Sequence, residues 1–128
     1  NGRHVWQFRS NTANRYATIG IIQPHLVPSS AAVRCIGYML RCGDGTISKV
    51  TTDGTTKWYS FDRKYACQCW SGDEITMTLD FGQRSIGFGI NGVEFHKAFD
   101  IEMNEYRATI SCAPGQNSFS LISYDHQY

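Results

Sequence analysis

The sequence predicts an all-β fold, an antiparallel β-sandwich of two twisted sheets, and three observations support that class. Short runs of alternating apolar and polar residues are separated by turn signals about every 8–12 residues, a pattern typical of sandwiches. Glycine accounts for 12 of the 128 residues and aromatic side chains for 13%, which suits short strands joined by tight turns. No window repeats apolar residues at i, i+3, i+4 and i+7 for more than about one turn, so no long helix is expected.

Two strands are expected near the start of the chain, at residues 4–9 and 16–22. The first (HVWQFR) directs Trp6 and Phe8 to one face, because alternate residues of a strand point the same way. The second (YATIGII) is apolar enough to be largely buried, and Gly20 within it indicates a bulge or a close approach of another backbone segment. The polar run between these strands predicts a loop.

The next part of the chain is expected to contain longer loops and a sheet edge. Residues 23–32 hold two of the three prolines and predict a long loop before a strand at 35–41. Two Asp-Gly turns, at 44–45 and 53–54, then bracket a short strand, followed by residues 55–61. These strands are modest and mostly polar, which favours a hairpin at the edge of a sheet over one in its centre.

The clearest strands form a meander in the second half of the chain. Residues 75–81 (ITMTLDF) and 85–90 (SIGFGI) alternate large apolar residues with small or polar ones. Asn91-Gly92 follows, the strongest short-range hairpin signal, because a type I′ turn needs positive φ at both central residues. Val93 and Phe95 then begin a return strand. The apolar face of this meander must be covered, which predicts a second sheet packed on it.

Two further strands are expected before the C-terminus. Residues 100–105 are polar and could form one helical turn, and residues 106–112 alternate as a strand. A turn at 113–117 (APGQN) leads to a last strand at 119–124. The total is about ten or eleven short strands.

Length and charge set limits on the class of protein. A chain of 128 residues is expected to form one domain, and because it starts at Asn1 without an initiator methionine we expect it to be part of a longer protein. The net charge is +1 with scattered Lys and Arg, which argues against a nucleic-acid partner. No apolar run is long enough to span a bilayer, so no membrane association is expected.

The cysteines and the absence of glycosylation sites favour a reducing environment. The five cysteines are an odd number without disulfide-framework spacing, and no Asn-x-Ser/Thr acceptor occurs. Two disulfides and one free thiol would also fit that count. The sequence therefore predicts a cytoplasmic, intracellular protein.

The meander carries a distinctive set of residues, namely Gly72-Asp73-x-Ile75, Leu79-Asp80, Ser85-Ile86-x-Phe88-x-Ile90-Asn91-Gly92 and Ala98-Phe99. This set resembles the SPRY domain, the core of the B30.2 class of interaction modules. Residues 2–8 (GRHVWQF) are similar to the opening Gly-x-His-aromatic-Trp-Glu strand of that family, with Val5 and Gln7 as departures. The resemblance covers the SPRY core without the PRY segment that precedes it in tripartite-motif proteins.

The resemblance implies a concanavalin-like SPRY sandwich that acts as a non-catalytic module. Such a domain would bind a peptide or a protein surface through loops at one rim, need no cofactor, and be a monomeric domain within a larger protein. By the same resemblance it would be the substrate-recognition or adaptor part of a ubiquitin ligase.

The resemblance also nominates the loops that would bind the ligand, 10–16, 28–34 and 113–116. Arginines there would pair with an acidic group, the tyrosine would form an aromatic wall, and amide side chains would bond an extended backbone. The nominated residues are Asn11, Asn14, Arg15, Tyr16, Ser30, Arg34, Pro114, Gly115 and Gln116.

The sequence offers little for catalysis or metal binding. Cys67-x-Cys69 is half of a zinc motif, but no second Cys or His pair has zinc spacing, so structural thiols are favoured. The four histidines are isolated from one another, and no nucleophile elbow, HExxH motif or phosphate-binding loop accompanies them. Neither an enzyme nor a metal site is expected.

Two alternatives come from other functional classes. A carbohydrate-binding, lectin-like sandwich would use Trp58 or Trp70 as an exposed stacking platform, whereas the structural interpretation is that each tryptophan caps an end of the core. A hydrolase would need paired carboxylates in a cleft, and the glutamates all lie beside turns or in the polar connection. A packing role within a large assembly is a further alternative.

Overall fold

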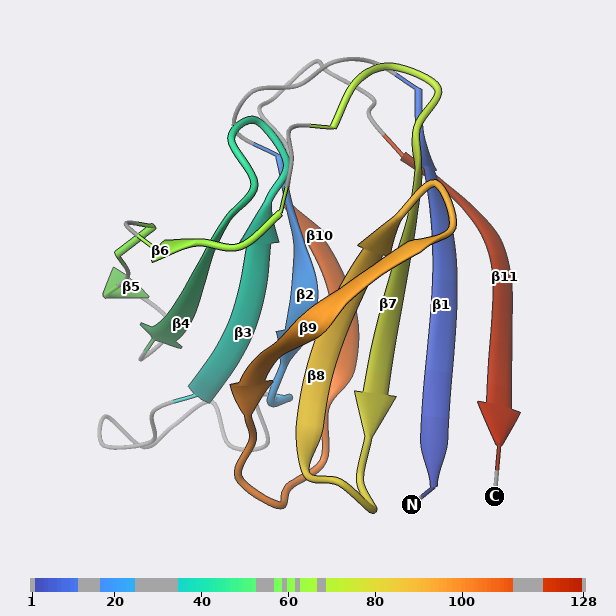
Figure 1. Ribbon diagram of the computed structural model, residues 1–128. Coiled ribbons are helices and arrows are strands. Elements are labelled where there is room, and N and C mark those ends of the chain that lie inside the picture. Colours follow the sequence, from blue (N-terminus) through green and yellow to red (C-terminus); the bar gives the residue numbers. More distant parts are fainter. Residues whose placement is uncertain are drawn as a thin grey trace.

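Two antiparallel β-sheets stacked face to face make up the computed structural model of the chain (Figure 1). The structure describes residues 2–11, 17–24, 35–52, 57–58, 60–61, 63–66, 69–111 and 119–127. Within these residues there are eleven strands and no helix long and apolar enough to cross a membrane. The predicted all-β antiparallel sandwich is confirmed.

The first sheet has five strands in the order β11-β1-β7-β8-β9. Its central part is the predicted meander, so neighbours in sequence pair directly, while β1 joins from the N-terminus and β11 from the C-terminus. The strands are β1 (Arg3–Ser10), β7 (Glu74–Asp80), β8 (Ser85–Ile90), β9 (Val93–Asp100) and β11 (Phe119–Gln127).

The second sheet follows the order β10-β2-β3-β4-β5, with β6 also paired to β4. The strands are β2 (Thr18–Ile22), β3 (Cys35–Arg41), β4 (Thr46–Thr52), β5 (Lys57–Trp58), β6 (Arg63–Lys64) and β10 (Arg107–Ser111). Gly20 of β2 has the predicted close backbone approach, because a Cβ there would lie 2.0 Å from the carbonyl oxygen of Tyr38.

The core lies between the sheets and is built by the alternation read from the sequence. In β7 every second residue is buried, which directs Ile75, Met77 and Leu79 inward and the threonines outward. The largest fully buried side chains come from both sheets, and they are Tyr38, Ile19, Ile21, Leu40, Ile47, Ile75, Met77, Leu79 and Ile86.

Two local expectations have different outcomes. The Asn91-Gly92 turn is confirmed, with φ of 51° and 82° at the two residues. The hairpin after Asp44-Gly45 was expected at a sheet edge, and this holds for its second strand, β5, but not for its first, β4. β4 pairs with β3 on one side and with β5 and β6 on the other, and its Ile47 is only 1% exposed. The consecutive residues Thr46, Ile47 and Ser48 of β4 are all buried, so both of its faces are covered, and the edge position belongs to two-residue strands.

Candidate recognition rim

Four segments meet at the end of the sandwich that is uppermost in Figure 1. We call this end the upper rim and define it by residues 10–11, 42–45, 69–73 and 91–93. Backbone hydrogen bonds tie the segments together. The N–H of Ser10 donates to the carbonyl of Asp73 (2.8 Å), and the N–H of Gly72 donates to the carbonyl of Ser10 (2.6 Å). The N–H of Cys69 donates to the carbonyl of Cys42 (3.0 Å). The rim is therefore a connected surface that links both sheets.

Trp70 is the most prominent side chain of the upper rim. Its side chain is 59% exposed although the turn that carries it is held at several points. The N–H of Trp70 donates to Oδ2 of Asp73 (2.7 Å), and the N–H of Asp73 returns to the carbonyl of Trp70 (3.0 Å). Gly72 adopts a φ of 91°, a conformation that only glycine takes without strain. The interpretation of Trp70 as a cap on the core is wrong.

Asp73 and Asn91 connect this turn to the β8–β9 hairpin. Nδ2 of Asn91 donates to Oδ1 of Asp73 (3.0 Å), while Oδ1 of Asn91 accepts from the N–H of Glu74 (2.9 Å). Each oxygen of the Asp73 carboxylate thus holds a different segment. The sequence identified Asn91 as a turn former and Asp73 as part of the SPRY-like set, but their side-chain contact joins residues 18 positions apart and has no local signal.

Asn11 is the one nominated ligand-binding residue within the described part of the chain. It is exposed, its Nδ2 donates to Oγ of Ser120 (2.8 Å), and its carbonyl accepts from Oγ of Ser71 (2.9 Å). It lies directly beside the turn that carries Trp70. The other nominated residues lie outside the described residues, and they are Asn14, Arg15, Tyr16, Ser30, Arg34, Pro114, Gly115 and Gln116.

The strand ends show where the nominated loops leave the sandwich. Register pairs Ser10 with Phe119 and Ser111 with Thr18, so the segments 11–17 and 112–118 both leave from the upper rim. The segment 23–34 instead joins the far ends of β2 and β3, where Ile22 pairs with Gly37. The described strand ends that flank two of the three nominated loops therefore lie at the same end of the sandwich as Trp70. The contribution of all nine nominated residues to ligand binding stays a prediction.

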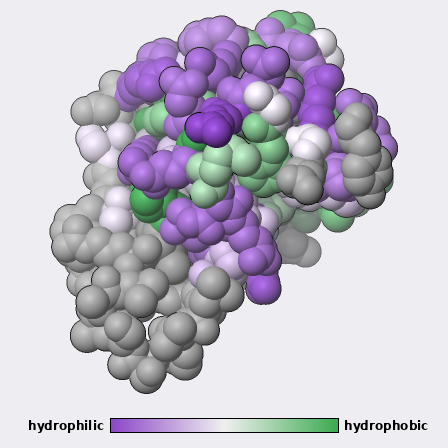
Figure 2. All heavy atoms as spheres, turned by 90° about the horizontal axis from the view of Figure 1, so that it is seen from below, coloured by the Kyte–Doolittle hydropathy of each residue, from purple (hydrophilic) through white to green (hydrophobic). Residues whose placement is uncertain are grey.

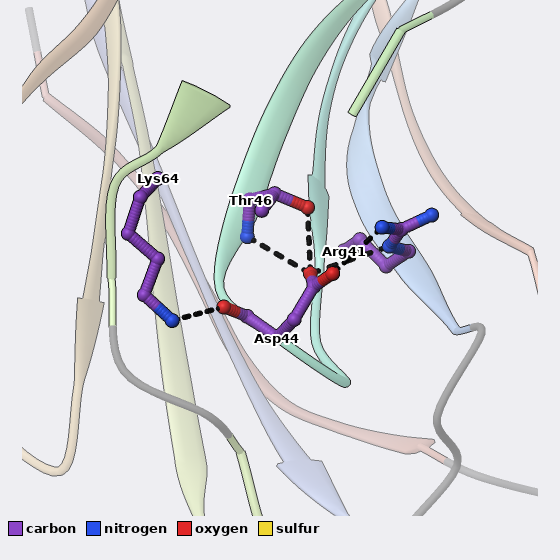
Figure 3. A network of polar contacts seen from close by, with 4 residues as sticks. All are labelled: Arg41, Asp44, Thr46 and Lys64. Carbon is purple, nitrogen blue, oxygen red and sulfur yellow. Dashed lines mark hydrogen bonds and ion pairs between the residues drawn. The ribbon is translucent and has the colours of Figure 1, made fainter. Parts of the chain in front are cut away.

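The β3–β4 turn of the upper rim is organised by the Asp44 carboxylate (Figure 3). Its Oδ2 accepts from Nη2 of Arg41 (2.6 Å), and its Oδ1 accepts from Oγ1 and the N–H of Thr46 (2.6 and 3.1 Å). Lys64 from β6 donates to the Asp44 carbonyl. The Arg41 guanidinium, followed by the Thr46 donors, holds the pKa of Asp44 well below its usual range.

Replacing Asp44 with asparagine is expected to lower the free energy of unfolding by about 1 kcal/mol at pH 7, since solvent screens a half-exposed ion pair. The pKa of Asp44 is lowered in the folded state, so its contribution is complete above the unfolded pKa of about 4 and is lost as the pH falls below that value. The difference in the free energy of unfolding between wild type and Asp44→Asn, measured in urea, should therefore be smaller at pH 2.5 than at pH 7. The control is Asp100→Asn, which removes the more exposed ion pair with Lys97. This substitution should change the free energy of unfolding little at either pH. An equal difference for Asp44→Asn at both pH values would contradict this assignment.

Two thiols lie beneath the rim. Cys42 and Cys69 are 2% and 6% exposed and form no disulfide. A hydrogen bond from the Cys42 thiol lowers the pKa of Cys69, against the opposing effect of burial. Among the residues that the structure describes, no group of three or more His, Cys, Asp or Glu side chains is arranged to hold a metal ion. Cys67, the other half of the Cys-x-Cys pair, lies outside those residues, as do the Trp58 side chain and Cys112.

Comparison with solved structures identifies the architecture. The crystal structure of the SPRY domain of human HERC1 matches with a TM-score of 0.68 over 94% of this chain and 74% of that chain, at 23% sequence identity. No protein-family model matches the sequence. No curated protein matches it either. The resemblance carried by the meander and the N-terminal strand is thus confirmed in three dimensions, and the chain has the fold of a SPRY domain.

Proposed function

We propose that this chain is a non-catalytic module that binds a peptide or a protein surface through the upper rim. SPRY domains are generally protein-interaction modules. The observation that carries the proposal for this chain is Trp70, a large aromatic side chain that is 59% exposed on a turn fixed by hydrogen bonds. Tryptophan is the residue type most enriched among those that dominate binding energy at protein interfaces.

The surroundings of Trp70 support a preorganised contact surface. Val93, 60% exposed, adds apolar area on the neighbouring hairpin, while Asn11 adds a polar group beside it. Because the segments are tied to one another, little conformational entropy would be lost when a partner binds. An exposed apolar centre with polar groups around it is the usual composition of a protein interface.

Trp70→Ala is expected to weaken binding of a rim ligand by about 30-fold or more, which corresponds to roughly 2 kcal/mol for a dominant interface residue. The ligand would be a peptide selected on the wild-type domain from a displayed library, with Kd measured by calorimetry. The melting temperature should stay nearly constant, because the side chain contributes little to the core.

Met103→Ala is the matched control for this experiment. Met103 is 50% exposed and lies in the connection from β9 to β10, at the opposite end of the molecule. Seen from below, that end presents hydrophilic side chains around a smaller group of hydrophobic ones (Figure 2). Unchanged affinity in Trp70→Ala, or equal losses in both variants, would refute binding through the upper rim.

The proposal extends to the setting of the domain. We place it as a monomeric domain within a larger intracellular protein, as the substrate-recognition or adaptor part of a ubiquitin ligase. The support is the SPRY resemblance and the odd number of cysteines without disulfide-framework spacing, which suits a reducing compartment. Ubiquitylation of a captured rim ligand by the full-length protein, lost on Trp70→Ala, is the corresponding test.

A second candidate function is lectin-like carbohydrate binding at the same tryptophan. The exposure of Trp70 favours it, because sugar rings stack on exposed indole faces. A glycan array probed with wild type and Trp70→Ala separates the two candidates.

A further inference from the structure

The outer face of the first sheet carries a shallow groove of about 190 Å³ that is separate from the upper rim. Two cross-strand rows form it. One row runs Thr78, Gly87 and Lys97 across β7, β8 and β9, and the other runs Thr76, Gly89 and Glu94. Each row therefore places a hydroxyl on one side, a glycine on the floor and a charged side chain on the other side.

Gly87 keeps the floor of this groove open without a structural need for glycine. Its φ is not in the left-handed region, and a Cβ at this position would meet its nearest neighbours only at 3.9 Å. Glycine inside a strand is unfavourable for stability, so packing alone would favour a larger residue here. Gly89 differs, because a Cβ there would lie 2.9 Å from the carbonyl oxygen of Val93. The lack of a side chain at Gly87, unlike that at Gly89, is therefore explained by the open groove and not by backbone packing.

A split between β8 and β9 forms part of the floor. The register of the two strands shifts on both sides of Gly87, so the backbone groups of Phe88 and His96 do not pair with each other. The hydroxyl of Tyr65 bridges them from the inner side. It accepts from the N–H of Phe88 (3.0 Å) and donates to the carbonyl of His96. The floor is therefore fixed although the strands separate.

The charges that line the groove cancel. Arg3 and Lys97 contribute two positive charges, and Asp80 and Glu94 contribute two negative charges. Lys97 is also paired with Asp100 at 2.7 Å. An ionic ligand would gain little from this balance, whereas a neutral ligand with several hydroxyls could donate to the carboxylates and accept from the cations and threonines.

From these observations we infer that the groove binds a neutral polyhydroxylated small molecule of about one sugar ring. The volume is below the roughly 300–1,000 Å³ of pockets for drug-sized ligands, which limits the occupant to that size. Phe95 also lines the groove, while its half-buried ring packs against Tyr65 of the core, with ring centroids 5.7 Å apart. This site is independent of the protein-binding rim.

The test is a titration of the isotope-labelled domain by NMR. The probes are glucose, galactose, mannose and N-acetylglucosamine, with the linear polyol sorbitol as a separate arm. Saturable shifts are expected at the amides of 76–78, 87–89 and 94–97. Binding by the ring sugars alone would identify a sugar as the natural source of the hydroxyls, and equal binding of sorbitol would identify a polyol.

Gly87→Ala should reduce the affinity at least tenfold while leaving the melting temperature unchanged or higher, because the added Cβ fills the groove without a clash. Thr78→Val should also weaken binding, whereas Thr109→Val, on the second sheet, should not. The absence of shifts, shifts centred on Trp70, or full affinity in Gly87→Ala would each overturn the inference. None of these results bears on the Trp70→Ala peptide experiment, so the two proposals fail separately.

Discussion

Replacing Tyr65 with phenylalanine is expected to lower the free energy of unfolding by about 3 kcal/mol. Tyr65 is 7% exposed. Its hydroxyl accepts a hydrogen bond from the N–H of Phe88 and donates one to the carbonyl of His96, at the point where β8 and β9 separate. Removing the hydroxyl would leave the buried N–H of Phe88 and the part-buried carbonyl of His96 without this partner, and an unpaired buried group costs roughly 1–3 kcal/mol. Burial raises the pKa of Tyr65, so the hydroxyl keeps its proton and can both donate and accept at neutral pH. Urea unfolding at pH 7 measures the effect.

Tyr106→Phe is the matched control, because it removes the same atom from an exposed hydrogen bond. The hydroxyl of Tyr106 donates to the carbonyl of Glu102 at 2.7 Å, where water can replace it. Burial of the ring raises the pKa of Tyr106 to about 12, so this hydroxyl is also protonated at pH 7. The expected cost is below about 1 kcal/mol. Similar losses in the two variants would mean that the β8–β9 split does not depend on the Tyr65 hydroxyl.

The meander could be predicted from the sequence because its signals are local. The strand expected at 75–81 is found at Glu74–Asp80, and the one expected at 85–90 is found at Ser85–Ile90. Period-2 alternation fixes which face is buried, and the Asn91-Gly92 turn fixes the register of the hairpin. Both effects act within a few residues. The same reasoning placed β1 to within one residue at each end.

The features that the sequence could not provide depend on contacts between distant segments. Tyr65 meets Phe88 across 23 residues, and no pattern near Tyr65 indicates that a strand elsewhere is bulged. The exposure of Trp70 follows from how its turn is tied to Ser10 and Asp73, whereas tryptophan by composition suggests burial. Gly87 was visible as a glycine in a strand, and this was the one local signal of the groove. Only the structure separates it from Gly89.

Leu40→Ala is expected to cost about 3–4 kcal/mol, because it removes a fully buried side chain from the interface between the sheets. Leu40 is 0% exposed in β3 and belongs to the same core cluster as Ile19 and Ile47 of the adjacent strands. Large-to-small changes at such sites lose the transfer free energy of the deleted atoms and also leave a cavity, for a total of roughly 2–5 kcal/mol. The central strands on both sides restrict relaxation into that cavity. The measurement is equilibrium unfolding in urea.

Leu121→Ala supplies the comparison, since the substitution is identical and only the environment differs. Leu121 lies in the edge strand β11 and is 60% exposed, so its truncation should cost less than about 1 kcal/mol. Its cross-strand partner is Phe8, on the face of β1 that points toward the second sheet. A one-residue slip of β11 would turn Leu121 to the opposite face. If Leu121→Ala lowered the free energy of unfolding as much as Leu40→Ala does, Leu121 would have to be buried. That result would contradict the exposed position of Leu121 in the edge strand β11.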